Sequence, residues 1–484
     1  MALLLSPGVA LGLLWVLCSF FLRWNELRSH QRRVLLPPGT MGWPVVGETI
    51  EFLRRGPDFL KKQRARYGSL FTSHLLGSPT VVSMDLEVNR WILMNEGRGL
   101  VPGYPQAMAE ILGEWNVAAV HGAFHRVVRG ALLSVVGPAA VRERLFPTLD
   151  EFIRSHLCDW GGSGGGGATV DVQEKAREMA FSSALKLIAG IETGEMATEL
   201  KAEFFKLVRG TLSLAVDLPG TAYRRGLQAR KRIIRLLRGL IVERRRSSPS
   251  VMKGGRDMLS LLLREEGEEE QDVHQTGPKL TDEQIIDLLI SVIYSGFETV
   301  STAATMAVKY LHDNTSALQE LRKEYSEISR RKSPAEGALT WGDYTSMEFT
   351  RAVILETMRL ATIVNGVLRK TTEDIAMNGF VVPKGWRIYV YTRESNYDSL
   401  RYPAPLRFDP WRWKDRSLEN HQHFMMFGGG GRLCPGKELG LVQISLFLHY
   451  FLTRYRWEDA GGNEIVQFPR VEAPRGLHIR VWPN

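Results

Sequence analysis

The chain has 484 residues, of which 44% are apolar and 24% are charged, so a large buried core is feasible. Its net charge of +9 is modest for this length. A basic protein can bind nucleic acid, an anionic membrane surface or an acidic protein. Nucleic acid is the least expected of these, because no stripe of basic residues interleaved with aromatics occurs. The three scattered cysteines, Cys18, Cys158 and Cys434, exclude a disulfide framework and fit a reducing compartment.

Residues 1–22 predict a transmembrane anchor. They carry no charged side chain, and about 20 apolar residues suffice to span a bilayer as a helix. Four arginines follow between positions 23 and 33 with only Glu26 opposing them, so the bulk of the protein is expected to face the cytosol. A cleaved signal peptide is the alternative, but the segment lacks both a basic start and a small-residue cleavage site.

Residues 23–48 predict a basic, proline-rich connector between this anchor and a body that spans 49–484. The connector contains Pro37, Pro38 and Pro44, and proline fixes φ and resists helix formation. Near the start of the body, "SLFTSHLLGSPTVVSMD" (69–85) alternates around Gly77-Ser78 and predicts a small β-hairpin.

The remainder of the body is predicted to be mainly α-helical with a small β portion. Apolar residues recur at three- and four-residue spacing through 130–160, 170–190, 200–245, 281–312 and 345–360. Between 365 and 392 the pattern changes to short β-type runs broken by Asn378-Gly379 and Pro383-Lys384-Gly385. Residues 161–167 and 264–279 predict solvated loops, the first rich in glycine and the second in charge.

Two histidines early in the body could form a metal pair. His121 and His125 are four residues apart and would share one face of a helix. No third ligand lies at a credible spacing, and Arg126 and Arg129 would repel a cation, so a metal site is not expected there.

The helix predicted over 281–312 has a polar interruption at its middle. It begins with a capping box formed by Thr281 and Gln284. Gly296, within "SGFET", costs about 1 kcal/mol in a helix interior and therefore needs a reason. Close helix packing is one explanation, and room for a ligand beside Glu298 and Thr299 is the other.

The glycine-rich segment "FGGGGRLCPGKELG" (427–440) admits two interpretations. A phosphate-binding P-loop fails because Glu438 replaces the hydroxyl residue, Pro435 removes a backbone donor, and the preceding residues make a poor strand. A metal-binding thiolate fits better, because Arg432 and the start of the next helix would lower the pKa of Cys434. A buried structural cysteine is the alternative.

The spacing F-x-x-G-x-R-x-C-x-G in this segment resembles the haem-thiolate loop of the cytochrome P-450 monooxygenases. The resemblance implies the cytochrome P-450 fold and a haem b cofactor whose iron takes Cys434 as its axial ligand. It further implies that Phe427, Arg432 and Gly436 belong to the haem-binding loop. A thiolate ligand pushes electron density onto iron and favours O–O cleavage.

The same resemblance assigns roles to residues elsewhere in the chain. Thr299 would hydrogen-bond dioxygen and Glu298 would relay protons, although Ser295 departs from the commonest residue before that motif. Arg129 keeps the arginine of a W-x-x-x-R element that binds the haem propionates, whereas His125 stands where tryptophan is usual. Arg369 matches another propionate-binding arginine.

One further set of residues is implied to be structural. Glu356 and Arg359 are three apart on one helix face and would pair. Arg412, in "FDPWRW", matches the arginine that completes a Glu-Arg-Arg network in the family. This network holds the core on the haem side of the fold and is not catalytic.

Stretches from Pro37 to the end of the chain resemble the plant hormone-metabolising branch of the family, and most of all the brassinosteroid C-6 oxidases. This implies oxidation of 6-deoxocastasterone to castasterone through a 6-hydroxy intermediate. It also implies NADPH–cytochrome P-450 reductase as the electron donor and a single-pass location in the endoplasmic reticulum membrane. Two alternatives stay open: a related monooxygenase acting on a gibberellin precursor or abscisic acid, and a haem-thiolate protein that does not activate oxygen. The intact Glu298-Thr299 pair argues against the second.

Overall fold

The computed structural model describes residues 11–12, 14–21, 35–43, 46–158, 160–161, 167–246, 257–263, 280–332, 337–462 and 464–484. The predicted charged loop 264–279 lies outside these residues, as does most of the predicted glycine-rich loop 161–167. Of the predicted anchor, only 11–12 and 14–21 are described; they are helical and expose six large apolar side chains, which are Leu11, Leu14, Trp15, Val16, Leu17 and Phe21.

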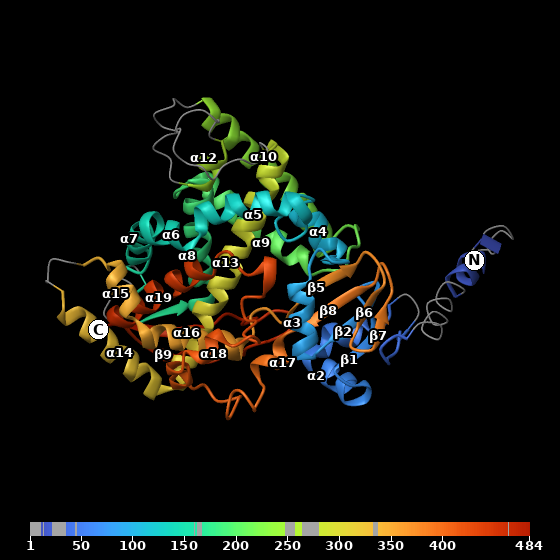
Figure 1. Ribbon diagram of the computed structural model, residues 1–484. Coiled ribbons are helices and arrows are strands. Elements are labelled where there is room, and N and C mark those ends of the chain that lie inside the picture. Colours follow the sequence, from blue (N-terminus) through green and yellow to red (C-terminus); the bar gives the residue numbers. More distant parts are fainter. Residues whose placement is uncertain are drawn as a thin grey trace, which may run out of the picture. The chain divides into compact units, whose positions relative to one another are not determined.

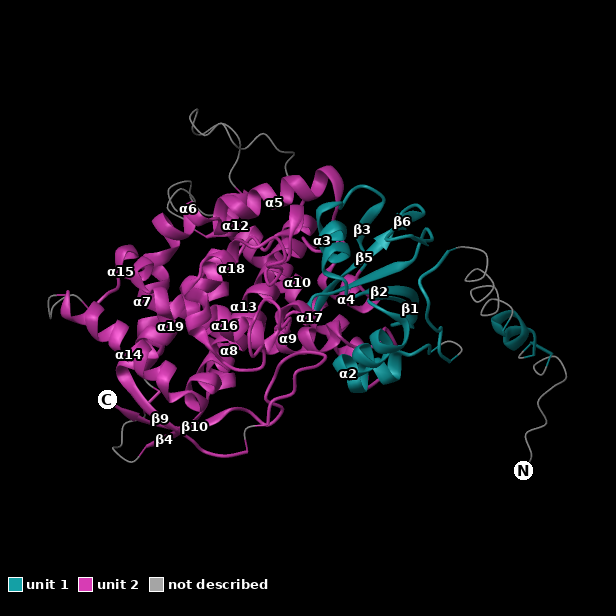
Figure 2. Cartoon of the chain, turned by 60° about the horizontal axis from the view of Figure 1, so that its bottom comes forward, with its two compact units in different colours: residues 1–103, 366–392 teal, residues 104–365, 393–484 magenta. Residues whose placement is uncertain are grey.

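The chain divides into two compact units, which Figure 2 colours separately. Unit 1 consists of residues 1–103 and 366–392, and unit 2 consists of residues 104–365 and 393–484. Together they form a mainly helical protein with a small β portion, as the sequence predicts. Unit 1 contains α2 (Thr49–Tyr67), β1 (Leu70–Leu75), β2 (Ser78–Ser83), α3 (Leu86–Met94), β3 (Leu100–Pro102), β5 (Gly366–Thr371), β6 (Ile375–Met377), β7 (Phe380–Val382) and β8 (Arg387–Tyr391).

Unit 2 contains most of the helices, some of them interrupted by short π or 3-10 turns (η). In chain order its elements are α4 (Gln106–Leu112), α5 (Gly122–Val136), α6 (Pro138–Ala140), η1 (Val141–Leu145), α7 (Phe146–His156), β4 (Ala168–Asp171), α8 (Val172–Ala184), η2 (Leu185–Ala189), α9 (Glu195–Thr211), α10 (Ala222–Arg246), α12 (Met258–Leu263), α13 (Asp282–Asp313), α14 (Thr315–Arg330), α15 (Trp341–Ser346), α16 (Glu348–Ala361), α17 (Arg393–Asn396), η3 (Pro410–Lys414), α18 (Ser417–Asn420), η4 (Gly430–Arg432), α19 (Lys437–Arg454), β9 (Tyr455–Asp459) and β10 (His478–Pro483).

The sheet of unit 1 confirms the predicted hairpin and the predicted β-type runs. Its strand order is β1-β2-β8-β5-β3, and β1 pairs with β2 antiparallel around a turn at Leu76-Gly77. The β6–β7 pair turns at Asn378-Gly379, where both residues have positive φ, a conformation that asparagine and glycine tolerate best. Part of the predicted connector also packs here, because Thr72 of β1 donates from its N–H to the Pro38 carbonyl and from its hydroxyl to the Pro37 carbonyl.

Helix α13 forms the centre of unit 2, where α8, α16 and α19 pack against it (Figure 1). The predicted capping box is present: the Thr281 hydroxyl accepts from the Gln284 N–H, and the Gln284 side chain accepts from the Thr281 N–H. By length and composition, α13 is the one helix in the described ranges that could cross a membrane. Its most apolar window is 61% buried inside the protein, so it is a core helix.

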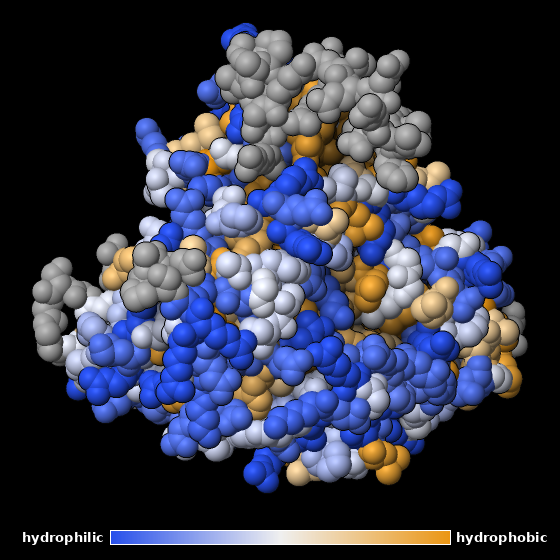
Figure 3. Space-filling view, turned by 60° about the vertical axis from the view of Figure 1, so that its left-hand side comes forward, coloured by the Kyte–Doolittle hydropathy of each residue, from blue (hydrophilic) through white to orange (hydrophobic). Residues whose placement is uncertain are grey.

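A three-stranded sheet in unit 2 joins segments that are far apart in the sequence. Its order is β4-β10-β9, with antiparallel pairing throughout, so residues 168–171 pair with the C-terminal strand. The face of the molecule in Figure 3 is mostly hydrophilic with scattered apolar patches, in keeping with a core that lies inside the helical layers.

Candidate active site

The cysteine loop is a closed turn that leads directly into α19. The Cys434 N–H donates to the Phe427 carbonyl at 2.9 Å, which closes the loop. Gly428 and Gly430 have φ of +78° and +60°, a region that favours glycine. Two of the four consecutive glycines are therefore required by the backbone path.

The Cys434 thiol experiences opposing electrostatic effects. Burial among protein atoms raises its pKa, while a hydrogen bond from the Gly436 N–H and the positive charges of Arg129 and Lys437 oppose that rise. The sequence predicts that Arg432 lowers this pKa, but its guanidinium donates instead to the carbonyls of Val117 and Val120. Burial outweighs these effects in the protein alone, and a metal cation bound at the sulfur would favour the thiolate.

Open space lies against this loop, as a flat prosthetic group requires. Cys434 has an exposed surface although protein atoms surround it closely enough to raise its pKa. A Cβ added at the half-buried Gly436 would meet no protein atom within 4 Å. The neighbouring apolar Leu433 is 44% exposed. The loop therefore fits a haem, and Cys434 is the residue that would hold its iron.

The predicted oxygen site lies on an exposed strip in the middle of α13. Ser295 and Thr299 are exposed, one helical turn apart, although most of this helix is buried. The Thr299 hydroxyl donates to the Ser295 carbonyl at 2.8 Å. A Cβ at Gly296 would meet only the Ala184 side chain, at 3.9 Å, so helix packing alone does not require glycine there.

Unit 2 brings the cysteine loop and this strip of α13 together. A Cβ built at Gly440, in the second turn of α19, would lie 3.8 Å from Val300 Cγ2. Val300 is the residue after Thr299, and Gly440 is six residues after Cys434. Helices α13 and α19 therefore pack against each other close to Thr299 and Cys434, although the two residues are about 135 positions apart in the sequence.

Glu298 is held by a partner that the sequence analysis missed. Arg470 Nη1 lies 3.0 Å from Glu298 Oε1, and both side chains are about one-fifth exposed. Tyr294 is one turn before Glu298, and burial raises its pKa. No local pattern could reveal Arg470, because it is 172 residues further along the chain.

Helix α5 carries two of the three predicted propionate-binding residues and places one of them at the cysteine loop. Arg129 Nη2 donates to the Leu433 carbonyl at 2.6 Å, and burial lowers the pKa of the Arg129 guanidinium. His125 is buried one turn earlier on the same helix, whereas His121 is exposed at the N-cap position and makes no side-chain capping bond. The propionate-binding role of both residues remains a prediction.

Arg369 belongs to unit 1, on β5. It is buried, its Nη2 lies 3.4 Å from Glu96 Oε2, and its Nη1 donates to the Leu368 carbonyl at 3.1 Å. This salt bridge therefore lies inside the unit and not on its surface. Its propionate-binding role remains a prediction.

The predicted Glu-Arg-Arg network is confirmed, with Glu356 and Arg359 fully buried and the Arg412 side chain 7% exposed. Glu356 and Arg359 form a bidentate ion pair with both contacts at 2.8 Å, and neither side chain is exposed. Arg412 Nε donates to Glu356 Oε1 at 3.1 Å. Trp413 Nε1 and the Asp409 N–H also donate to the Glu356 carboxylate, and the sequence analysis predicted neither bond.

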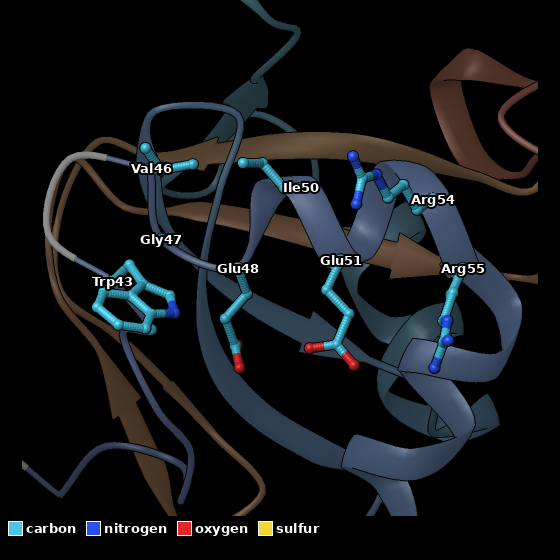
Figure 4. Close-up of a pocket in the computed structure, with 9 residues that line it drawn as sticks. Trp43, Val46, Gly47, Glu48, Ile50, Glu51, Arg54 and Arg55 are labelled. Carbon is cyan, nitrogen blue, oxygen red and sulfur yellow. The ribbon is translucent and has the colours of Figure 1, made fainter.

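A separate hollow of about 990 Å³ in unit 1 does not have the chemistry of this site. Figure 4 shows its lining, which includes Trp43, Ile50, Glu51 and Arg54. The carboxylate of Glu48, also in the lining, accepts hydrogen bonds from Ser73 and Gln63, so it stabilises the fold locally.

Comparison with known proteins identifies the class. The cytochrome P-450 family pattern matches residues 37–473. The solved structure of retinoic-acid-bound cyanobacterial CYP120A1 superposes with a TM-score of 0.81 over 93% of this chain and 100% of that one, at 25% identity. The chain belongs to the cytochrome P-450 family; it is a monooxygenase, and its cofactor is a haem with thiolate-bound iron.

Plant relatives indicate which branch of the family the chain resembles. Cytochrome P-450 85A1 of Solanum lycopersicum is 58% identical over 97% of both chains, and the protein of the same name from Oryza sativa subsp. japonica is 57% identical over 99% of both. Cytochrome P-450 90D2 of Oryza sativa subsp. japonica is 37% identical over 98% of this chain and 96% of its own length. The chain is a plant-type member similar to the 85A proteins.

Proposed function

We propose that this chain oxidises C-6 of 6-deoxo brassinosteroids, converting 6-deoxocastasterone to castasterone through a 6-hydroxy intermediate. The observation that carries the proposal is the near full-length identity of 57–58% with the 85A1 relatives, against 37% with 90D2. The sequence resemblance to the brassinosteroid C-6 oxidases supports the substrate. Two oxidations at one carbon are required, the first forming an alcohol and the second a ketone with loss of water.

Cys434 is the proposed axial ligand, and its neighbours stabilise the charge that it would carry. When bound, the haem supplies the oxidant that inserts one atom of dioxygen into a C–H bond. The Gly436 N–H and the cations Arg129 and Lys437 act on the sulfur and favour the thiolate. The Phe427 carbonyl accepts the hydrogen bond that closes the loop, and Gly436 supplies the N–H beside the sulfur. Arg432 connects the loop to the carbonyls of Val117 and Val120.

Three further residues are proposed to bind the propionates. These groups are carboxylates, which paired arginine forks recognise well. Arg129 and His125 contribute from α5, and Arg369 contributes from β5.

Glu298 and Thr299 are the proposed proton-handling residues. The Thr299 hydroxyl lies on the exposed strip of α13, and its present bond to the Ser295 carbonyl is one that rotation about χ1 can exchange. The Glu298 carboxylate accepts from Arg470 and so connects the strip to a second charged group. Together they can hold a proton near the open space and replace it after it is used.

We expect replacement of Thr299 by valine to lower product formation by roughly 10-fold to 100-fold, because the methyl that replaces the hydroxyl cannot donate a proton. Consumption of NADPH and oxygen should continue, so the measurement is product formed per NADPH consumed. Thr302→Val is the matched control, since the Thr302 hydroxyl makes the same kind of bond, to the Glu298 carbonyl at 2.8 Å. Equal effects of the two substitutions would remove Thr299 from the proposed site.

Residues 1–22 are the proposed single-pass anchor, and 23–48 the connector to the haem domain at 49–484. The exposed apolar side chains of the described part support this, because an isolated helix that exposes leucine and tryptophan is suited to a bilayer. The proposed location is the endoplasmic reticulum membrane with the haem domain in the cytosol. There the chain would receive electrons from NADPH–cytochrome P-450 reductase.

Product mass spectrometry tests the function. Microsomes containing this chain, a plant reductase and NADPH are offered 6-deoxocastasterone, ent-kaurenoic acid or abscisic acid separately. We expect a ketone from the steroid alone, no product without the reductase, and release of the chain from the membrane when it begins at residue 23. A product from ent-kaurenoic acid or abscisic acid, with none from the steroid, would establish the alternative substrate class. No product from any of the three, despite a thiolate-type spectrum, would retain the haem loop and refute the proposed substrate.

A further inference from the structure

The segment between α4 and α5, residues 113–120, is here called the bridging loop. It begins at Gly113, which has φ of +100°. A Cβ at this position would lie 2.2 Å from the carboxylate of Asp287. Glycine is therefore required both by the backbone conformation and by the approach of a buried acid from α13.

Asp287 anchors the first end of the bridging loop. It is 4% exposed, and its Oδ2 accepts from the Trp115 N–H at 3.1 Å. Its Oδ1 is paired with the guanidinium of Arg230 on α10, which also donates to the Ile111 carbonyl at the end of α4. Removing either partner of such a buried ion pair is strongly destabilising, because the remaining charge is left without compensation. The loop is thus fixed to α10 and α13 together.

Arg432 anchors the second end from the cysteine loop. Its Nη1 donates to the Val117 carbonyl at 2.8 Å and its Nη2 donates to the Val120 carbonyl. These two bonds span 315 and 312 residues of sequence and link the cysteine loop to the bridging loop. Charge-assisted bonds to two acceptors fix the direction as well as the position of a guanidinium.

Asn116 makes the bridging loop rigid between its two ends. It is 2% exposed, and its Nδ2 donates to the Gly113 carbonyl. Its Oδ1 accepts from the N–H groups of Ala118 and Ala119 at 3.0 Å and 2.9 Å. A loop braced internally in this way moves as one piece, so a displacement at Trp115 reaches Val117 and Val120.

We propose that Asp287 and Arg230 are positioning residues for the cysteine loop, acting through the bridging loop and Arg432. Arg432 is two residues before Cys434, so the carbonyls that hold its guanidinium also limit where the Cys434 sulfur can lie. Reactive groups must be held within about 0.5 Å of their productive geometry, and supporting residues provide that precision. The inference rests on the proposed role of Cys434 as ligand.

The test uses Asp287→Asn, which removes the charge and keeps the shape. Asp257→Asn is the matched control, because Asp257 is buried and pairs with Arg244 on the same helix α10 at 3.0 Å, without a bond to the bridging loop. The readouts are hydrogen exchange of the amides in 114–120 and 428–436, and the rate at which the reduced carbon monoxide complex loses its thiolate-type absorption. We expect Asp287→Asn to speed exchange in both segments by roughly tenfold or more, and to speed that loss. Asp257→Asn should change none of these.

A second variant covers the case in which Asp287→Asn does not fold. Gly113→Ala keeps the Asp287 charge but forces the carboxylate and the loop apart, so it should produce the same pattern. Faster exchange in 114–120 with unchanged exchange in 428–436 would overturn the proposal, and so would equal effects from Asp257→Asn. A wild-type protein without thiolate-type absorption would instead count against Cys434 as ligand, and the exchange data would still decide the coupling of the two loops.

Discussion

Replacing Cys434 by alanine is expected to abolish both the thiolate-type absorption of the reduced carbon monoxide complex and product formation. The sulfur is the group of the loop that can give iron a thiolate ligand, and the adjoining N–H and cations act on it. Glu438, the acid of the same segment, accepts a hydrogen bond from the Tyr344 hydroxyl instead. The loop itself should persist, because its closing bond runs from the backbone N–H of residue 434 to the Phe427 carbonyl. Far-ultraviolet circular dichroism should therefore be unchanged.

Cys158→Ala is the matched control for this substitution. Cys158 is also exposed, but its thiol donates to the Arg154 carbonyl in unit 2 and is remote in sequence from the glycine-rich loop. This variant should keep both the spectrum and the activity. A thiolate-type spectrum that survives in Cys434→Ala, or disappears in Cys158→Ala, would assign the ligand to another residue.

Replacing Arg359 by alanine should lower the free energy of unfolding by about 3–5 kcal/mol, since it leaves the Glu356 carboxylate buried without its main counter-charge. Arg359 is fully buried and also donates to the carbonyls of Asn396 and Pro405, so the substitution breaks bonds to α17 and to the segment before η3. Urea titration followed by tryptophan fluorescence measures the change. Haem content should fall in parallel, because this core adjoins α19.

An exposed pair with the same helical spacing provides the control. Lys323 and Glu320 on α14 are also three residues apart, with 3.2 Å between charged atoms, but their side chains are 73% and 37% exposed. Lys323→Ala should cost less than about 1 kcal/mol, because solvent screens the pair and already satisfies both ions. Similar losses for Arg359→Ala and Lys323→Ala would show that burial of the network does not determine its contribution.

Local patterns were sufficient to predict several elements of this protein. The hairpin of β1 and β2, the capping box of α13 and the turn at Asn378-Gly379 depend on residues close together in sequence, so alternation and turn chemistry determine them. The cysteine motif is equally local, because a loop that surrounds one sulfur is specified by glycines and donors within ten residues.

Contacts between distant segments could not be predicted in this way. The 130–160 region has a helical period throughout, yet the chain breaks at Gly137-Pro138 and continues through a π turn into α7. The pairing of Glu298 with Arg470, and the bonds from Arg432 to Val117 and Val120, join residues 172 to 315 positions apart. The type of a hydrogen-bonding side chain does not indicate which distant residue it will bond to.

The sequence by itself determined the family, the cofactor chemistry and the residues at which to look for it, because those depend on short motifs whose spacing is fixed by the group they bind. The tertiary structure alone decided which charges act on Cys434. Burial raises the pKa of its thiol, Arg129 and Lys437 oppose that effect, and Arg432 is committed to the bridging loop. The reason is physical: a charge acts according to its distance and its surroundings, and both are set by packing between segments and not by position along the chain.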